Sequence, residues 1–192
     1  IELLNNKYFY VGQSYKYLKS TFNSLKKKEK NKGLNAAKKD IQEIISGTSK
    51  KGKGYNSKTN FKLQNKFKKN NIKILVSCHS FSDSPHVWGD FFFADFYEWL
   101  CFLGKISKIT NYTWLIKPHP STAKNDIKYL EQIRNKYNKF IIIDPKISNN
   151  SLVKQKINLA LTCFGKVSYE YPYQGIPVIN ASKNNPCICF NF

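Results

Sequence analysis

From residue 71 onward the sequence alternates short apolar runs with segments of helical periodicity, and this alternation restricts the fold more than any other feature. Such an order of strands and helices is typical of a parallel sheet whose crossovers are helices. The apolar run at residues 72–78 suits a strand that is buried on both faces. The expected strands are residues 72–78, 112–116, 140–143, 157–162 and 177–180, and the expected helices are residues 92–109, 122–137, 150–155 and 166–173.

The alternation predicts an α/β fold: a Rossmann-like domain of three layers with a mainly parallel sheet over residues 71–192. Residues 1–70 are rich in Lys, Asn and Ser, and we expect them to form a basic peripheral or linker segment. Apolar residues at helical spacing predict one helix there, residues 34–46, which Gly47 ends; residues 47–60 have the composition of a loop. Because the chain opens without Met and ends abruptly, we expect a fragment that is truncated at its C-terminus.

The formal net charge of +20 suggests a nucleic-acid ligand, because clustered cations neutralise phosphates. However, Arg134 is the only Arg, and the bidentate readout of base edges favours Arg over Lys. The many Lys, Asn, Ile, Tyr and Phe are the residues that an AT-rich genome encodes, which explains much of the charge. We therefore expect no specific nucleic-acid binding, and an anionic membrane surface is an equally good partner for the lysines. No apolar run is long enough to predict a transmembrane helix.

The cysteines are odd in number and most of them lie inside apolar segments, which favours reduced, buried thiols. A reducing, cytoplasmic location follows, with the inner face of the plasma membrane as a peripheral site. Only Cys187 and Cys189 are close together, and no second pair stands at the spacing of a zinc ribbon. The five cysteines are Cys78, Cys101, Cys163, Cys187 and Cys189.

Unusual residues gather in three loops, each of which follows an expected strand: residues 78–86, 117–121 and 162–170. All three histidines of the chain fall in the first two loops. Right-handed crossovers place the carboxyl ends of parallel strands at one edge of the sheet, where ligands of such sheets bind. The sequence therefore predicts that the three loops form one site.

The second loop carries Lys117-Pro118-His119-Pro120. Two prolines fix φ on either side of His119, so its imidazole projects from a stiff turn. Such a histidine, beside Lys117 and ahead of a helix start at Ser121, suits a phosphate that also meets backbone N–H groups. The alternative is a histidine that only stabilises the turn.

The third loop has the pattern of a strand, a tight glycine turn and a helix start. Gly165 can adopt a backbone conformation forbidden to other residues, and the following helix start offers unpaired amides to a phosphate. Ser168 lies in the first turn, and Glu170 could accept hydrogen bonds from ribose or sugar hydroxyls. The alternative for Ser168 and Glu170 is ordinary helix capping.

The first loop places Asp83 between His79 and His86. A carboxylate beside imidazoles is a workable base for an acceptor hydroxyl, and we expect His79, Ser80 and His86 to face the donor or the acceptor. Metal binding is the rival interpretation, and we rank it lower because no further ligand supports the two histidines. Capping of the next segment by Asp83 and Ser84 is the structural alternative.

The second and third loops together resemble the C-terminal domain of GT-B glycosyltransferases. Within that group the chain is most similar, from residue 72 to its end, to capsule polysaccharide biosynthesis proteins, which are related to bacterial Kdo transferases, sialyltransferases and glycerophosphate polymerases. The resemblance implies a donor-phosphate contact at His119, nucleotide-phosphate contacts at Thr162 and Ser168, and a ribose contact at Glu170. The sequence departs from the family pattern at 163–164, where small polar residues are commoner. The matching segments are residues 117–120, 161–170 and 175–179.

The resulting expectation is a metal-independent glycosyltransferase of surface polysaccharide biosynthesis, with no cofactor. Its substrates would be a nucleotide-sugar donor and a glycan or lipid-linked acceptor, and an N-terminal domain of the same enzyme would be missing from this chain. Lys117, His119 and the turn at Gly165 would stabilise the departing phosphate, with Asp83 and His119 as catalytic residues. The alternatives are an enzyme similar to UDP-sugar 2-epimerases, a basic nucleic-acid-binding module and an inactive homologue.

Overall fold

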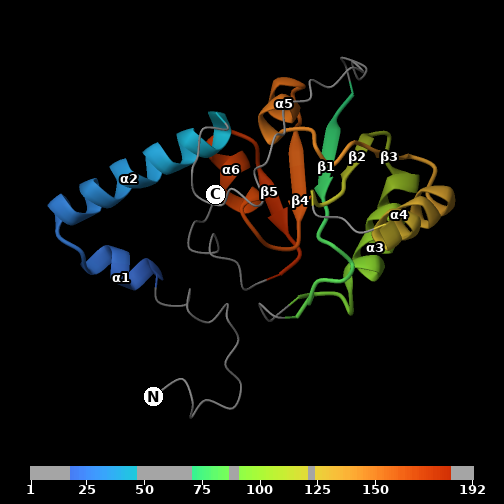
Figure 1. Cartoon of the computed structure of the whole chain (residues 1–192), viewed down its shortest axis with the longest axis horizontal. Helices are drawn as coiled ribbons and strands as arrows, with labels where there is room; N and C mark the ends of the chain where they lie inside the picture. Colours follow the sequence, from blue (N-terminus) through green and yellow to red (C-terminus); the bar gives the residue numbers. More distant parts are fainter. Residues whose placement is uncertain (1–17, 47–70, 87–90, 121–123, 183–192) are drawn as a thin grey trace, which may run out of the picture.

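A computed structural model of the chain describes residues 18–46, 71–86, 91–120 and 124–182. Its centre is a sheet of five parallel strands in the order β3-β2-β1-β4-β5 (Figure 1). This sheet confirms the α/β fold expected from the alternation of apolar runs and helices. The strands are β1 (Lys73–Ser77), β2 (Thr113–Lys117), β3 (Phe140–Ile142), β4 (Leu159–Thr162) and β5 (Val178–Asn180).

Helices cover both faces of the sheet and make the three layers. On one face, α3 and α4 pack on side chains such as Ile74, Val76 and Trp114. On the other face, Leu75 and Leu115 pack against α5 and α6. The two sets alternate along each strand, as the period of two in a β-strand requires. The helices are α3 (Phe96–Ile109), α4 (Lys124–Lys136), α5 (Asn149–Lys154) and α6 (Val167–Tyr173).

The sheet has a topological switch point next to β1, where the chain stops adding strands on one side and begins on the other. The chain builds β2 and β3 on one side of β1 and then crosses back to build β4 and β5 on the other side. The loops after β1 and β4 therefore leave the sheet in opposite directions. A crevice outside the carboxyl ends of such strands is the usual ligand site of open α/β sheets.

Helix α3 begins at Phe96, so the expected start at residue 92 is wrong. The side chain of Asp95 accepts a hydrogen bond from the amide of Glu98, and the Glu98 carboxylate accepts one from the amide of Ala94. These two bonds fix the first turn much as a capping box does, except that Glu98 reaches the amide of Ala94, one residue before the N-cap. Before it, Phe91 pairs with Ser182 in an isolated bridge.

Helices α3 and α4 approach each other closely at Gly104. A Cβ atom added there would collide with the ring of Tyr137, which is buried. We expect Gly104→Ala to lower the free energy of unfolding by about 1–3 kcal/mol in urea denaturation, because a packed core has no room for the methyl group. Gly33→Ala is the matched control: it lies in an exposed helix with nothing within 4 Å of the added Cβ and should be neutral or slightly stabilising. Equal stability of the two variants would contradict the predicted collision.

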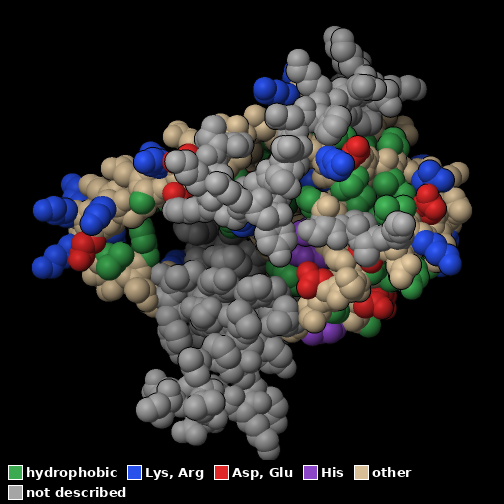
Figure 2. Space-filling view, viewed as in Figure 1, with side chains coloured by type: hydrophobic (Ala, Val, Ile, Leu, Met, Phe, Trp, Pro, Cys, Tyr) green, Lys and Arg blue, Asp and Glu red, His purple; other side chains and the backbone are tan. Residues whose placement is uncertain are grey.

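The described residues before the sheet form the helices α1 (Leu18–Ser24) and α2 (Lys27–Ser46). Helix α2 contains the expected residues 34–46 but begins earlier, because the Glu29 carboxylate caps the amide of Lys26. None of its residues is buried, and Figure 2 shows lysine side chains exposed along this part of the molecule. The C-terminal end of α2 nevertheless contacts α5.

The described helices include none that is long and apolar enough to cross a membrane. Of the cysteines, Cys78 and Cys163 are buried and Cys101 is partly buried, all three as free thiols. Burial raises the pKa of the Cys78 thiol to about 12, which makes it inert rather than reactive. The expected loop at 47–60 and the C-x-C pair at 187–189 lie outside the described residues.

Candidate functional site

A cavity of about 510 Å³ opens at the carboxyl ends of β1, β2 and β4, on the face that α5 and α6 cover. Its volume lies within the range of small-molecule sites. The cavity joins the first residues of all three loops singled out in the sequence. It also takes in the loop before α5, the inner side of α6 and the last residues of α2.

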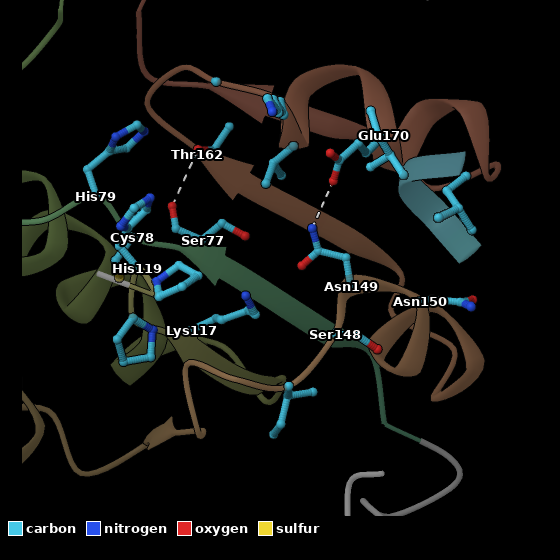
Figure 3. Close-up of a pocket in the computed structure, with 18 of the residues that line it drawn as sticks. Ser77, Cys78, His79, Lys117, His119, Ser148, Asn149, Asn150, Thr162 and Glu170 are labelled. Atoms are coloured by element: carbon cyan, nitrogen blue, oxygen red, sulfur yellow. Dashed lines mark hydrogen bonds between the residues drawn. The ribbon is translucent and has the colours of Figure 1, made fainter. Parts of the chain in front are cut away.

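The floor of the cavity is a row of polar residues at the last positions of adjacent strands. Lys117 and Ser77 are register partners, and Thr162 follows Leu161, the partner of Val76. These residues face the same side as the α5–α6 core, yet they line the cavity. The Thr162 hydroxyl lies 3.3 Å from the carbonyl oxygen of Ser77, which ties β4 to β1 (Figure 3).

Lys117 is the most unusual member of this row. It is only 8% exposed, and its ammonium group makes no hydrogen bond or ion pair with the described residues. Burial lowers the pKa of Lys117, and the negative charge of Glu170 partly opposes this effect. A largely buried lysine that has no partner among the described residues and lines a cavity is a candidate contact for an anion.

The hydroxyl of Ser77 stands beside this lysine. Its Oγ atom is buried and has no hydrogen-bond partner in the described part of the chain. Unsatisfied buried hydroxyls are rare, because each one loses its hydrogen bonds to water. Ser77 therefore adds a donor to the same floor. The sequence did not predict this role, because a serine at a strand end carries no distinctive pattern.

His119 lies at the edge of the cavity between Pro118 and Pro120, as expected. Partial burial lowers the pKa of its imidazole, and the nearby Lys117 lowers it further. The ring is thus neutral near pH 7 and gains a proton most easily when an anion enters beside it.

His79 also lines the cavity, but it is held in place by the protein itself. Its Nε2 atom lies 2.7 Å from the carbonyl oxygen of Phe164, and its ring stacks on Phe96 with centroids 5.3 Å apart. Its Nδ1 atom is 3.8 Å from the carboxylate of Asp83. His79 therefore fastens the loop after β1 to the loop after β4, with Nε2–H as donor to Phe164.

Burial lowers the pKa of His79 below its ordinary value of 6.5. The unfolded chain then binds more protons than the folded one as the pH falls, so His79 reduces stability as the pH drops through about 6.5. Between about pH 7.5 and about pH 5.5, we expect the wild type to lose more stability than His79→Gln, which keeps a donor for Phe164 but does not titrate. Urea denaturation at both pH values measures the difference, and equal losses would contradict it.

Gly165 provides the turn that leads from β4 into α6. Its φ is +111°, a backbone conformation that disfavours side chains. A Cβ atom there would still lie 3.8 Å from Cε1 of His79, so the backbone angle rather than space demands glycine. The amides of Gly165 and Lys166 face no backbone acceptor among the described residues and remain available to a ligand.

Glu170 stands on α6 at the other side of the cavity (Figure 3). It is 6% exposed, and its Oε2 atom accepts a hydrogen bond of 2.9 Å from the side-chain amide of Asn149. The Oδ1 atom of Asn149 is buried with no partner within the described segments. Asn149 was not among the residues predicted from the sequence. The Ser148-Asn149-Asn150 run follows β3, however, and the carboxyl ends of parallel strands lie at one edge of the sheet, so its position there was predictable.

Four predicted site residues do not line the cavity. The Ser168 hydroxyl donates to the side chain of Asn180 at 2.7 Å, and Ser80 donates to Asp126 at 2.5 Å. His86 bonds the carbonyl of Ala94, and the side chain of Asp83 is 56% exposed.

Helical geometry explains the position of Ser168. Residues two apart on an α-helix point about 200° apart, so Ser168 and Glu170 cannot face the same cavity. Gln174, four residues after Glu170, shares its side of α6 and does line the cavity. The phosphate contact expected of Ser168 thus has no support in the geometry.

The described residues contain no group of three or more His, Cys, Asp or Glu side chains arranged to hold a metal ion. In particular, His79 lies near Asp83, but His79 and His86 each bond a different backbone carbonyl group. The rival metal interpretation of the first loop therefore gains no support.

Comparison with protein-family models, curated proteins and solved structures finds no match to this chain. What the cavity can do must follow from its own chemistry. One side offers the Lys117 ammonium and the His119 imidazole, and the other offers a carboxylate held by an amide. Such a site can bind a ligand that is anionic at one end and rich in hydroxyl groups next to it.

Proposed function

We propose that the cavity binds the nucleotide part of a nucleotide-activated sugar, and that the chain is the donor-binding part of a glycosyltransferase of surface polysaccharide biosynthesis. The observation that carries this proposal is the buried Lys117 ammonium, which has no partner from the described protein and lines a cavity at the carboxyl edge of a parallel sheet. This is where such sheets bind phosphorylated ligands.

The diphosphate would lie over the floor of the cavity. Lys117 supplies a fixed positive charge, and the Ser77 hydroxyl and the amides after β4 supply hydrogen bonds. His119 approaches from its proline-flanked turn and can donate to the same group. A ligand with two negative charges restores the pKa of His119 upward, so binding and protonation support each other.

These groups would also assist the transfer step. When the bond between the sugar and the phosphate breaks, negative charge grows on the departing diphosphate. A buried cation and aligned donors stabilise this charge more strongly in a cavity than in water. Asp83 stays the proposed base for the acceptor hydroxyl, since its exposed carboxylate lies 3.8 Å from Nδ1 of His79, outside the cavity that would hold the nucleotide.

A thermal-shift panel of CMP, CDP, UDP and GDP tests the proposal. At a concentration about 100 times its dissociation constant, the matching nucleotide should stabilise the wild type by about 2.7 kcal/mol. The shift should shrink in His119→Ala, which lacks the imidazole at the cavity edge. If none of the four nucleotides raises the melting temperature of the wild type, the proposed donor site is refuted.

A further inference from the structure

Helix α2 belongs to the basic segment before the sheet, yet its last turn forms part of the cavity wall. Ile44 and Ile45 line the cavity and are half-buried. Leu34, nearer the start of the same helix, is 49% exposed. The end of α2 contacts α5 and lies close to α6 (Figure 1). A segment expected to be peripheral thus contributes side chains to the site.

The groups around the cavity follow a linear order (Figure 3). Lys117, His119 and His79 lie at one side, Glu170 with Asn149 comes next, and the end of α2 lies beyond Glu170. The polar end therefore carries cations, the middle carries a carboxylate, and the far end carries aliphatic side chains.

A nucleoside diphosphate has the same order of chemistry: phosphates, then a ribose with two hydroxyl groups, then a flat base with apolar faces. The isoleucine side chains at the end of α2 line the cavity and are available to pack on the base. The amide groups of Asn150 and Gln174 line the same cavity and can hydrogen-bond to its polar edge. A small number of well-placed polar groups in an otherwise apolar wall is typical of specific small-molecule sites.

We propose that the C-terminal turn of α2 is the nucleobase wall of this site, with Ile44 and Ile45 packed against the base. The proposal rests on the nucleotide-binding function proposed above and adds to it that residues before the sheet determine binding of the nucleoside. Anion binding at Lys117 does not require α2, because no α2 side chain is charged near the floor: Ile44, Ile45 and Ser46 are the lining residues of this helix.

Calorimetric titration of the full chain with CDP, UDP, GDP and inorganic pyrophosphate separates anion binding at Lys117 from binding of the base by α2. The variant is Ile44→Ala/Ile45→Ala, and the matched control is Leu34→Ala on the exposed part of the same helix. Alanine favours helix, so α2 is retained, and circular dichroism checks this directly. We expect the double variant to bind the preferred nucleoside diphosphate about tenfold more weakly through lost apolar contact, with pyrophosphate binding unchanged.

Each other outcome has a defined meaning. If the double variant binds the nucleoside diphosphate as tightly as the wild type, or if the wild type binds pyrophosphate just as tightly, α2 does not contact a base and the inference is overturned while the anion site stands. An equal loss of pyrophosphate binding also overturns it, because α2 would then act on the whole cavity. If the wild type binds none of the four probes, the proposed function itself fails and the inference fails with it.

Discussion

Lys117→Met should weaken binding of the preferred nucleoside diphosphate by about 10- to 100-fold, because a charge-assisted hydrogen bond in a buried site contributes about 1.5–3 kcal/mol. Methionine keeps the length of the side chain and removes the charge. In the ligand-free protein the same change should raise the free energy of unfolding by about 1 kcal/mol or more, since it removes a buried ammonium that has no partner in the described structure. A loss of affinity together with a gain of stability is what a binding residue predicts and a structural residue does not.

Lys73→Met is the matched control for Lys117→Met. Lys73 is also a buried lysine of the same sheet, 5% exposed, but it lies at the opposite edge and its ammonium donates to the carbonyl of Gln155. Its removal leaves that carbonyl without its donor, so stability should fall while nucleotide binding stays within about twofold. Calorimetry and urea denaturation measure both quantities on both variants. If Lys117→Met destabilises the free protein and binds the nucleotide normally, Lys117 is structural and the anion site is refuted.

Glu170→Gln should have the second-largest effect, a loss of about tenfold in affinity for the preferred nucleoside diphosphate. The amide keeps an oxygen that accepts from Asn149, but it loses the negative charge that strengthens hydrogen bonds from ribose hydroxyls. Pyrophosphate binding should stay the same or improve, because the negative charge that acts on Lys117 is gone. These opposite effects distinguish a ribose contact from general damage to the cavity.

Deoxyribose nucleoside diphosphates give the second test of Glu170. The wild type should prefer the ribose form, and Glu170→Gln should bind both forms with nearly equal affinity, because the lost hydroxyl and the lost charge remove the same hydrogen bond. Glu131→Gln on the exposed side of α4 is the control and should keep the preference. A preference that survives in Glu170→Gln would show that Glu170 does not contact the sugar.

The sequence was sufficient for the parallel sheet, because each buried strand and each helical segment carries a local periodicity. It was also sufficient to bring Lys117, His119 and Thr162 to one edge, since right-handed crossovers leave no other arrangement. Helix starts were less predictable. Capping hydrogen bonds at Glu29 and Asp95 accompany the observed starts of α2 and α3, and capping depends on a few polar side chains rather than on apolar periodicity.

The directions in which the site side chains point could be read only from the tertiary structure, except at Ser168. Helical spacing alone separates Ser168 from Glu170, and a stricter use of it would have excluded Ser168. By contrast, His79 turns inward to the carbonyl of Phe164, and Asp83, only four residues later, stays exposed. Loop residues have no periodicity, so their directions depend on the partners that packing brings to them.

The sequence by itself determined the class of fold, the edge of the sheet that carries the loops, and the rigid turn at His119. These follow from local periodicity and from the fixed φ of proline, which act within a few residues. Only the tertiary structure decided that Lys117 and Ser77 share one floor without a partner from the described segments, that Asn149 orients Glu170, and that α2 reaches the cavity. Each of these joins residues far apart in the chain, and such contacts form only when the packing of complete helices on the sheet excludes every other arrangement.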